Sequence, residues 1–367
     1  MPIGLLLMQW DPKVGTDIIE KYPEELTVSD ETLMQIYASH EYSEEPGMIS
    51  LFIGHLNLAS FYTGREKSLY IVLILHLDED ADAYEGGLSD ISRIILQHYD
   101  DDSYIDMIPF LFQRLSAYPI LNQEQIIAIT YQDEVNRLLI NRLREEGVVS
   151  KSELKIWLKD RYRRGFFDID ATLNELIRKE IIKETSVKGI PSELIFFIND
   201  IFIIRRPPVD LLKESEERGL PNDLKDEYKV TVKKWFENYQ ISEEDNLALL
   251  DIITDPQIFE VLKLLRIAIV TKNALMKLKK KGVEDIDECL KKLWEANIVH
   301  VFQDNNGNEY YALLSNPCIF LAHPKFILST IIHQYDVKSK SEPVLIEYLK
   351  VLDDNYSSIK IDIKNED

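Results

Sequence analysis

Residues 69–75 read Leu-Tyr-Ile-Val-Leu-Ile-Leu, and this run is the clearest fold signal in the chain. Its apolar residues alternate between both faces of a strand, which predicts a central strand that is covered on both sides. A second apolar run at residues 3–10 predicts another buried strand. It ends in a turn at residues 11–15, where proline and glycine interrupt strand pairing. The two runs predict a sheet in the N-terminal part of the chain.

The segments around these runs complete a five-strand pattern. Three more strands are expected, at residues 17–21, 48–53 and 56–62. Three helices are expected, at residues 29–40, 88–99 and 105–115. Ser29 or Asp30 is placed to cap the first of these helices. The order of elements predicts an α+β domain over residues 1–120, with a five-stranded sheet and flanking helices.

A different pattern follows the boundary marked by Pro119 and Asn122. Three helices are expected, at residues 134–146, 150–162 and 168–180. The second of them begins with a capping box, Ser150 followed by Glu153. Two strands are then expected, at residues 181–185 and 194–204. Three helices followed by a two-stranded wing predict a winged helix over residues 121–208.

The same pattern recurs after a linker. Pro207-Pro208 and a charged stretch begin a linker with connecting helices, expected over residues 209–252. The second copy is expected to have helices at residues 256–265, 271–281 and 286–296, and strands at residues 299–303 and 310–314. Terminal helices at residues 324–333 and 344–352 and a frayed polar tail are expected to end the chain. Residues 253–367 are therefore predicted to hold a second winged helix.

The composition describes a globular, acidic protein. Apolar residues make up 45% of the 367 residues, and no apolar run approaches the roughly 20 residues that span a bilayer. No basic, cleavable leader precedes the first strand, so no signal peptide is expected. Cys289 and Cys318 are too few for a disulfide framework and lack metal-site spacing. A cytoplasmic protein is the expectation.

Charge is unevenly distributed along the chain, whose formal net charge is -22. Residues 1–120 hold 21 acidic and 6 basic residues. This domain is a poor surface for nucleic acid or anionic lipid. The excess acidity is explained either by solubility or by an electrostatic partner surface, and both readings stay open.

Winged helices raise the question of DNA, which a third helix reads with basic and amide side chains. Here residues 168–180 carry four acids and two bases, and residues 284–295 carry five acids and two bases. DNA reading is therefore disfavoured. The second helices are basic, which leaves open a solvated face, docking on the acidic N-terminal domain, or nucleic acid. Their basic residues are Lys151, Lys155, Lys159, Arg161, Arg163, Arg164, Lys272, Lys277, Lys279, Lys280 and Lys281.

Enzymatic motifs are mostly absent from the sequence. It contains no phosphate-binding Gly-x-x-x-x-Gly-Lys-Ser/Thr or Gly-x-Gly-x-x-Gly, no Gly-x-Ser-x-Gly elbow and no His-Glu-x-x-His. His55 and His76 lie in strand patterns, and Cys318 with His323 lacks further ligands. No cofactor and no metal are expected, and whether the chain is an enzyme stays uncertain.

Four short stretches of the N-terminal domain are similar to a known family. They are Trp10-Asp11-Pro12-Lys13-Val14-Gly15, Ile18-Ile19, Tyr22-Pro23-Glu24 and Tyr62-Thr63-Gly64-Arg65. With this order of elements, the chain resembles longin-domain proteins that carry winged helices, and most closely the nitrogen-permease-regulator-like family. The resemblance covers about residues 3–100. It implies a longin domain that pairs with a second longin protein or with itself and binds a small Ras-like or Rag-like GTPase. Membrane association would be peripheral and through partners.

In the family's GTPase-activating member, an arginine after a tyrosine between the last two strands acts as an arginine finger. The resemblance carries this role to Arg65, although here Gly64 is inserted and Glu66 follows. Such an arginine stabilises the transition state, a contribution of roughly 10³–10⁵ in rate for small GTPases. Tyr62, Gly64 and Lys67 are the candidate partner-binding residues beside it. The alternative is a surface arginine on a hairpin.

Two other classes of function stay open. One is a transcription regulator with an N-terminal sensor domain, which would bind DNA in a salt-sensitive manner. The other is a tandem winged-helix scaffold of a membrane-trafficking assembly, whose binding would not depend on nucleotide state. The residue composition suits an archaeal source with eukaryote-like small GTPases.

Overall fold

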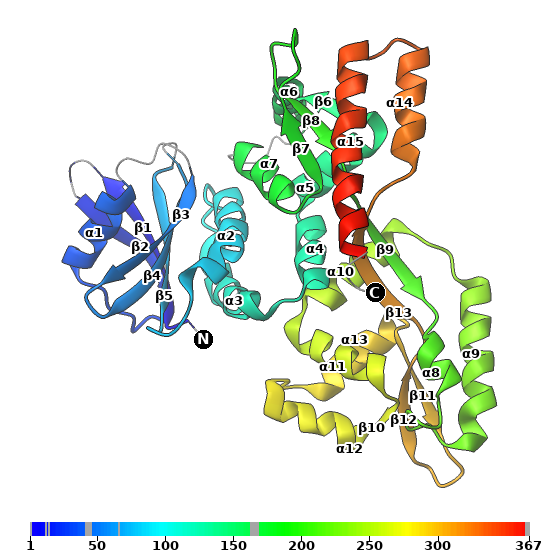
Figure 1. Ribbon diagram of the computed structural model, residues 1–367. Helices are drawn as coiled ribbons and strands as arrows, with labels where there is room; N and C mark the ends of the chain where they lie inside the picture. The colour runs from blue at the N-terminus through cyan, green and yellow to red at the C-terminus, as the bar shows by residue number, and fades with distance from the viewer. Residues whose placement is uncertain are drawn as a thin grey trace. The chain divides into compact units, whose positions relative to one another are not determined.

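The computed structural model describes residues 2–11, 13, 15–40, 46–64, 67–161 and 169–363 (Figure 1). The chain is a mixed α+β protein and forms two compact units. The first unit comprises Met1–Leu121 and Leu154–Glu175, and the second comprises Asn122–Glu153 and Leu176–Asp367. Some residues singled out from the sequence lie outside the described ranges: Pro12, Val14, Arg65, Glu66, Arg163, Arg164 and Asp168.

The first unit contains a five-stranded antiparallel sheet in the order β2-β1-β5-β4-β3. Its strands are β1 (Gly4–Asp11), β2 (Gly15–Tyr22), β3 (Gly47–Ile53), β4 (Leu56–Tyr62) and β5 (Leu69–Leu75). Strand β5 is central and buried at every residue, because all seven side chains are apolar and both faces of the sheet are covered. The prediction of a covered central strand is confirmed.

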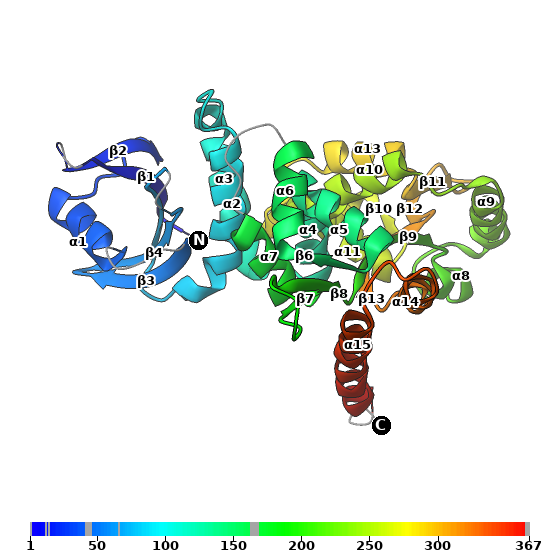
Figure 2. The same cartoon turned by 90° about the horizontal axis from the view of Figure 1, so that it is seen from above.

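Helices cover both faces of this sheet (Figure 2). They are α1 (Asp30–His40), η1 (Ala81–Tyr84), α2 (Glu85–Gln97), α3 (Tyr104–Ala117) and η2 (Tyr118–Ile120). Leu33 and Ile36 of α1 pack with Leu6 on one face, whereas Leu88 of α2 and Leu111 of α3 share the other core. Helix α1 begins where the sequence predicted, because the Ser29 hydroxyl accepts a hydrogen bond from the Thr32 N–H at 3.2 Å.

The chain continues with a helix that the sequence analysis missed, α4 (Gln123–Gln132). It is capped reciprocally, since Asn122 accepts from the Gln125 N–H and the Gln125 side chain accepts from the Asn122 N–H. The following elements are α5 (Glu134–Glu146), β6 (Val148–Ser150), α6 (Lys151–Arg161), α7 (Ile169–Arg178), β7 (Ile182–Thr185), β8 (Leu194–Phe197) and β9 (Asp200–Arg206). Helices α5, α6 and α7 and strands β7 and β8 follow the predicted order. Strand β6 was not predicted, and β9 was predicted as part of the same strand as β8.

The predicted strand over residues 194–204 is wrong as one continuous strand. It breaks between β8 and β9, because the N–H groups of Ile198 and Asn199 both donate to the Ile181 carbonyl. Strand β8 lies in a sheet with β6 and β7, whereas β9 pairs antiparallel with β13 (Asn316–Ala322). Strand β13 was not predicted. At the centre of this pair Ile203 lies opposite Ile319.

The elements that follow β9 in the chain are α8 (Val209–Lys213), η3 (Asn222–Leu224), α9 (Lys225–Asn238), α10 (Glu243–Thr254), α11 (Pro256–Ile267), β10 (Val270–Thr271), α12 (Lys272–Leu275), η4 (Met276–Lys281), α13 (Ile286–Glu295), β11 (Val299–Gln303) and β12 (Glu309–Leu313). The prediction of one α-helix over residues 271–281 is wrong, since a short α12 gives way to a 3₁₀ helix. Leu275 and Leu278, three residues apart, are both buried, as the three-residue turn of a 3₁₀ helix allows.

Two helices end the chain, α14 (Phe326–Asp336) and α15 (Glu342–Ile363). Both lie where terminal helices were predicted. A frayed polar tail was predicted after residue 352. This prediction is wrong for residues 353–363, because α15 continues for these eleven residues.

The series of elements from α4 to β9 recurs from α10 to β13. Arg144 on α5 donates through Nε to Asp200 at 2.8 Å and through Nη2 to the Ile201 carbonyl at 3.1 Å. Arg266 on α11 donates in the same way to Asn316 at 2.9 Å and to the Pro317 carbonyl at 2.5 Å. Corresponding side chains thus make corresponding bonds, and the two series are structural repeats.

The helix that follows each repeat packs on the opposite repeat. Tyr228 of α9, which follows the first repeat, donates its hydroxyl to the Leu313 carbonyl of the second repeat at 2.8 Å. Tyr348 of α15, which follows the second repeat, donates to the Phe197 carbonyl of the first at 2.7 Å. Because β9 and β13 pair antiparallel, each repeat ends beside the other. The second unit is therefore held together by exchanged helices.

Candidate functional site

The loop between β4 and β5, which the sequence analysis singled out, is closed at its base by backbone hydrogen bonds. The Thr63 N–H donates to the Leu69 carbonyl at 3.0 Å, and the Ser68 N–H donates to the Gly64 carbonyl at 3.1 Å. Gly64 has a φ of +94°, a conformation that favours glycine. Arg65 lies between these closed positions but outside the described residues. The described residues on both sides of positions 65 and 66 are therefore held by backbone hydrogen bonds.

Tyr62 anchors the strand that enters the loop. Its side chain is only 6% exposed and stacks on Tyr70 with ring centroids 4.9 Å apart. Such ring pairs stabilise a fold beyond the area that they bury. A buried ring has little surface for a partner, so the structure places Tyr62 beneath the loop as a support.

Lys67 ties the other side of the loop to the turn between α2 and α3. Its ammonium lies 2.5 Å from the Asp100 carboxylate and 5.1 Å from the centre of the Tyr99 ring. Its backbone carbonyl accepts a hydrogen bond from Gln9 Nε2 at 3.0 Å. The Lys67 charge is thus compensated within the first unit, and the contacts hold the loop in place.

A buried polar pair lies in the same core as Tyr62. His40 at the end of α1 is 2% exposed, and its Nε2 lies 2.9 Å from the Ser60 hydroxyl. Burial lowers the pKa of His40 to about 4, so the imidazole is neutral at pH 7. The ring lies 5.5 Å from Tyr70, whose pKa is raised by burial. The sequence analysis overlooked His40, whose only signal was its position at the end of an amphipathic helix.

The other histidines and cysteines considered from the sequence are either exposed or in contact with protein groups. His55 and His76 are exposed. Cys318 is buried, which raises the pKa of its thiol, and Arg206 Nε lies 3.0 Å from its sulfur. His323 Nδ1 lies 3.3 Å from the Ile198 carbonyl. Among the described residues no group of three or more possible ligands could hold a metal ion.

Strand β3 forms one edge of the five-stranded sheet, with β4 as its only neighbour in that sheet. Its Phe52 side chain is 70% exposed. An edge strand with an exposed aromatic side chain can accept a strand of another protein, because its outer backbone groups lack a partner within the sheet. The edge therefore is a second feature of this unit that suits contact with a protein.

In the part of the chain that the structure describes, no helix combines the length and the apolar character needed to cross a membrane. Comparison with known proteins finds no matching family model, no matching curated protein and no matching solved structure. The function is therefore argued from the chain's own residues.

Proposed function

We propose that this chain is a regulatory protein that binds a small Ras-like or Rag-like GTPase through its N-terminal domain, with Arg65 acting on the bound nucleotide. In this proposal the N-terminal domain is of the longin type and the two repeats are winged helices. The observed succession of strands and helices around the five-stranded sheet agrees with that assignment. The GTPase partner itself rests on the sequence resemblance.

The fixed base of the β4–β5 loop is the observation that carries the proposal. An arginine finger must be held stiffly if it is to reach phosphate oxygens without a large loss of conformational entropy on binding. Tyr62 is packed on one side of the loop, and Lys67 is tied to Asp100 on the other. The positive φ of Gly64 lets the backbone turn between them. These contacts supply the rigid support that such a finger needs.

The test is single-turnover GTP hydrolysis by small GTPases from the same genome, measured with the wild type and with Arg65→Ala. The wild type should accelerate hydrolysis by on the order of 10³-fold or more, and the variant should lose most of this effect. Arg161→Ala is the matched control, because it removes an exposed arginine from α6. It should retain full acceleration.

Binding is measured in parallel, with each GTPase loaded with GDP or with a non-hydrolysable GTP analogue. If binding depends on the nucleotide but hydrolysis is not accelerated, the chain would still be a GTPase-binding regulator, but Arg65 would not be an arginine finger. Equal acceleration by the wild type and Arg65→Ala would also remove the role of Arg65. Absence of binding to every GTPase in both nucleotide states would refute the proposed function.

A further inference from the structure

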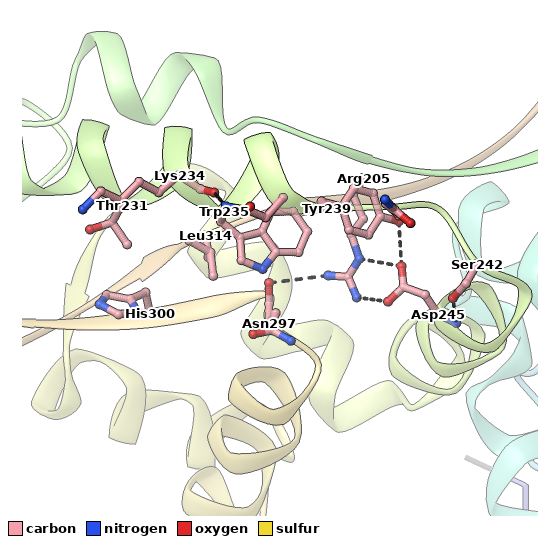
Figure 3. Close-up of a pocket in the computed structure, with 12 residues that line it drawn as sticks. Arg205, Thr231, Lys234, Trp235, Tyr239, Ser242, Asp245, Asn297, His300 and Leu314 are labelled. Atoms are coloured by element: carbon pink, nitrogen blue, oxygen red, sulfur yellow. Dashed lines mark hydrogen bonds and ion pairs between the residues drawn. The ribbon is translucent and has the colours of Figure 1, made fainter.

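The second unit contains an open groove of about 690 Å³ between α9, the start of α10, and the turn that leads into β11 (Figure 3). Its walls combine aromatic, amide and basic side chains. Its lining includes Arg205, Thr231, Lys234, Trp235, Asp245 and His300. All of these residues belong to the second unit, so the groove does not depend on the N-terminal domain.

One end of the groove is closed by a saturated ion pair. Arg205 Nε and Nη2 donate to the two Asp245 oxygens at 2.9 and 2.6 Å, and Nη1 donates to the Ser315 hydroxyl at 2.8 Å. The Tyr239 hydroxyl donates to Asp245 at 2.7 Å. Burial acts to raise the pKa of Asp245, but the bonds from Arg205 and Tyr239 hold it below its usual value. The carboxylate is therefore ionised and its charge is balanced by Arg205.

The other end holds groups that can donate hydrogen bonds to a ligand. Lys234, Thr231 and His300 lie together at this end, and the indole of Trp235 lies between them and Arg205 (Figure 3). Among the hydrogen bonds and ion pairs of the described residues, none uses the Lys234 ammonium, the Trp235 indole N–H or the His300 ring. Burial lowers the pKa of His300 below its usual value, which favours the neutral ring. Lys234 is therefore the one uncompensated charge among the lining residues.

The internal repeat offers a comparison within the same chain. Corresponding backbone bonds and helix caps align Arg205 with Leu321 and Asp245 with Gln125. On the same alignment Trp235 corresponds to Asn355, since their helices carry the equivalent Tyr228 and Tyr348. The ion pair and the aromatic wall therefore occur at only one of the two equivalent places: Arg205 lies in the first repeat, Asp245 lies in the second, and Trp235 lies on the helix between them. The other equivalent place packs without this ion pair or an aromatic wall. These groups are therefore not needed to hold the repeats together, which argues that they have another role.

We propose that this groove binds a small anionic ligand, a carboxylate or a phosphate carried on a planar body. The anion accepts hydrogen bonds from the Lys234 ammonium and from the neighbouring Thr231 hydroxyl (Figure 3). The planar body lies against the side chains of Trp235, Leu314 and His300. Asp245 does not repel the ligand, because Arg205 balances its charge. The Lys234 ammonium and the hydrogen-bond donors near it favour an anionic group on the ligand. The aromatic surface of Trp235 favours a planar body.

Three small probes test the proposal: benzoate, phenyl phosphate and benzamide. Benzamide matches benzoate in shape but carries no charge. Binding is followed through the indole N–H signals in NMR spectra of the full chain, which has four tryptophans. Trp235→Phe identifies the signal of interest. Benzoate, phenyl phosphate or both should shift the Trp235 signal, and benzamide should not. The tighter of the two anions identifies the charged group that the groove prefers.

Lys234→Gln should weaken binding of the preferred anion about tenfold, the loss expected for one charge-assisted hydrogen bond. Lys233→Gln is the matched control, since Lys233 is 77% exposed on the same helix and does not line the groove. It should leave the affinity unchanged. The proposal is overturned if neither anion shifts the Trp235 signal at up to about 20 mM, well above a millimolar Kd. Equal shifts with benzamide, or equal losses in the two lysine variants, would also overturn it.

Discussion

At the scale of single residues, Arg205 shows how a charge can be buried without being left unpaired. Its side chain is 2% exposed, and Asp245, Ser315 and the Asn297 carbonyl all accept its hydrogen bonds. The guanidinium also lies 5.4 Å from the ring centre of Trp235. A buried pair of this kind stabilises a fold little compared with apolar packing, but breaking it is costly because one charge stays buried.

We therefore predict that Asp245→Asn lowers the free energy of unfolding by about 3 kcal/mol. Arg205→Leu combined with Asp245→Gln should recover at least half of that loss. This double variant installs the residue types of the equivalent positions Leu321 and Gln125, where no buried charge remains. Urea denaturation at pH 7 measures both effects. A double variant as unstable as Asp245→Asn would show that the pair contributes more than the burial of one unpaired charge.

At the scale of elements, α9 and α15 each place a buried tyrosine against a strand of a repeat. Tyr228 and Tyr348 are both fully buried, and each donates its hydroxyl to a strand carbonyl. Tyr348 also packs on Phe196 with ring centroids 5.2 Å apart, and Tyr228 packs on Phe302 with ring centroids 5.3 Å apart. Equivalent contacts should have similar energies, because the chemistry and the burial of the two hydroxyl groups match.

Tyr228→Phe and Tyr348→Phe should each lower the free energy of unfolding by about 1–2 kcal/mol, since each leaves a buried carbonyl without its hydroxyl donor. Tyr335→Phe is the control, because that side chain on α14 is 60% exposed. It should change stability by less than about 0.5 kcal/mol. Thermal or urea unfolding measures all three variants. A large loss in one buried variant and none in the other would contradict the equivalence of the two helices.

At the scale of the whole molecule, charge determines which polymers the chain can bind. The formal net charge is -22, and several lysines of the basic second helices are compensated locally. Lys151 lies 2.7 Å from Glu184, Lys155 lies 2.7 Å from Asp170, and Lys272 lies 2.6 Å from Asp287. A basic helix whose charges are paired in this way presents less positive potential to phosphates than its sequence suggests.

We expect no binding of duplex DNA tighter than about 10 µM at 50 mM salt, because the net charge of -22 opposes the duplex and three lysines of the basic second helices are paired with carboxylates. Fluorescence anisotropy with a labelled 30-base-pair duplex measures this. Submicromolar binding that weakens steeply with salt would instead support the transcription-regulator alternative.

Elements with local signals could be predicted from the residues alone. The run Leu69–Leu75 predicted the central strand because every side chain is apolar, and Ser29 predicted the start of α1 because its hydroxyl caps the helix. The Ser150 hydroxyl likewise accepts a hydrogen bond from the Glu153 N–H, which is one half of the predicted capping box, whereas the Glu153 carboxylate accepts from Arg142. For the candidate site, the sequence located the β4–β5 loop. It could not show that Tyr62 is buried or that Asp100 holds Lys67.

Contacts between distant segments could be identified only in the folded chain. The pairing of β9 with β13, the exchange of Tyr228 and Tyr348 and the groove beside Trp235 join residues up to 151 positions apart. Such contacts leave no periodic signal, since a strand or a tyrosine reads the same whichever partner it meets. The break after β8 depends on hydrogen bonds to the Ile181 carbonyl. Ile181 lies just before β7, so its role cannot be identified from residues 194–204 alone. Local sequence signals therefore define the helices and strands, whereas long-range packing determines which of them contact one another.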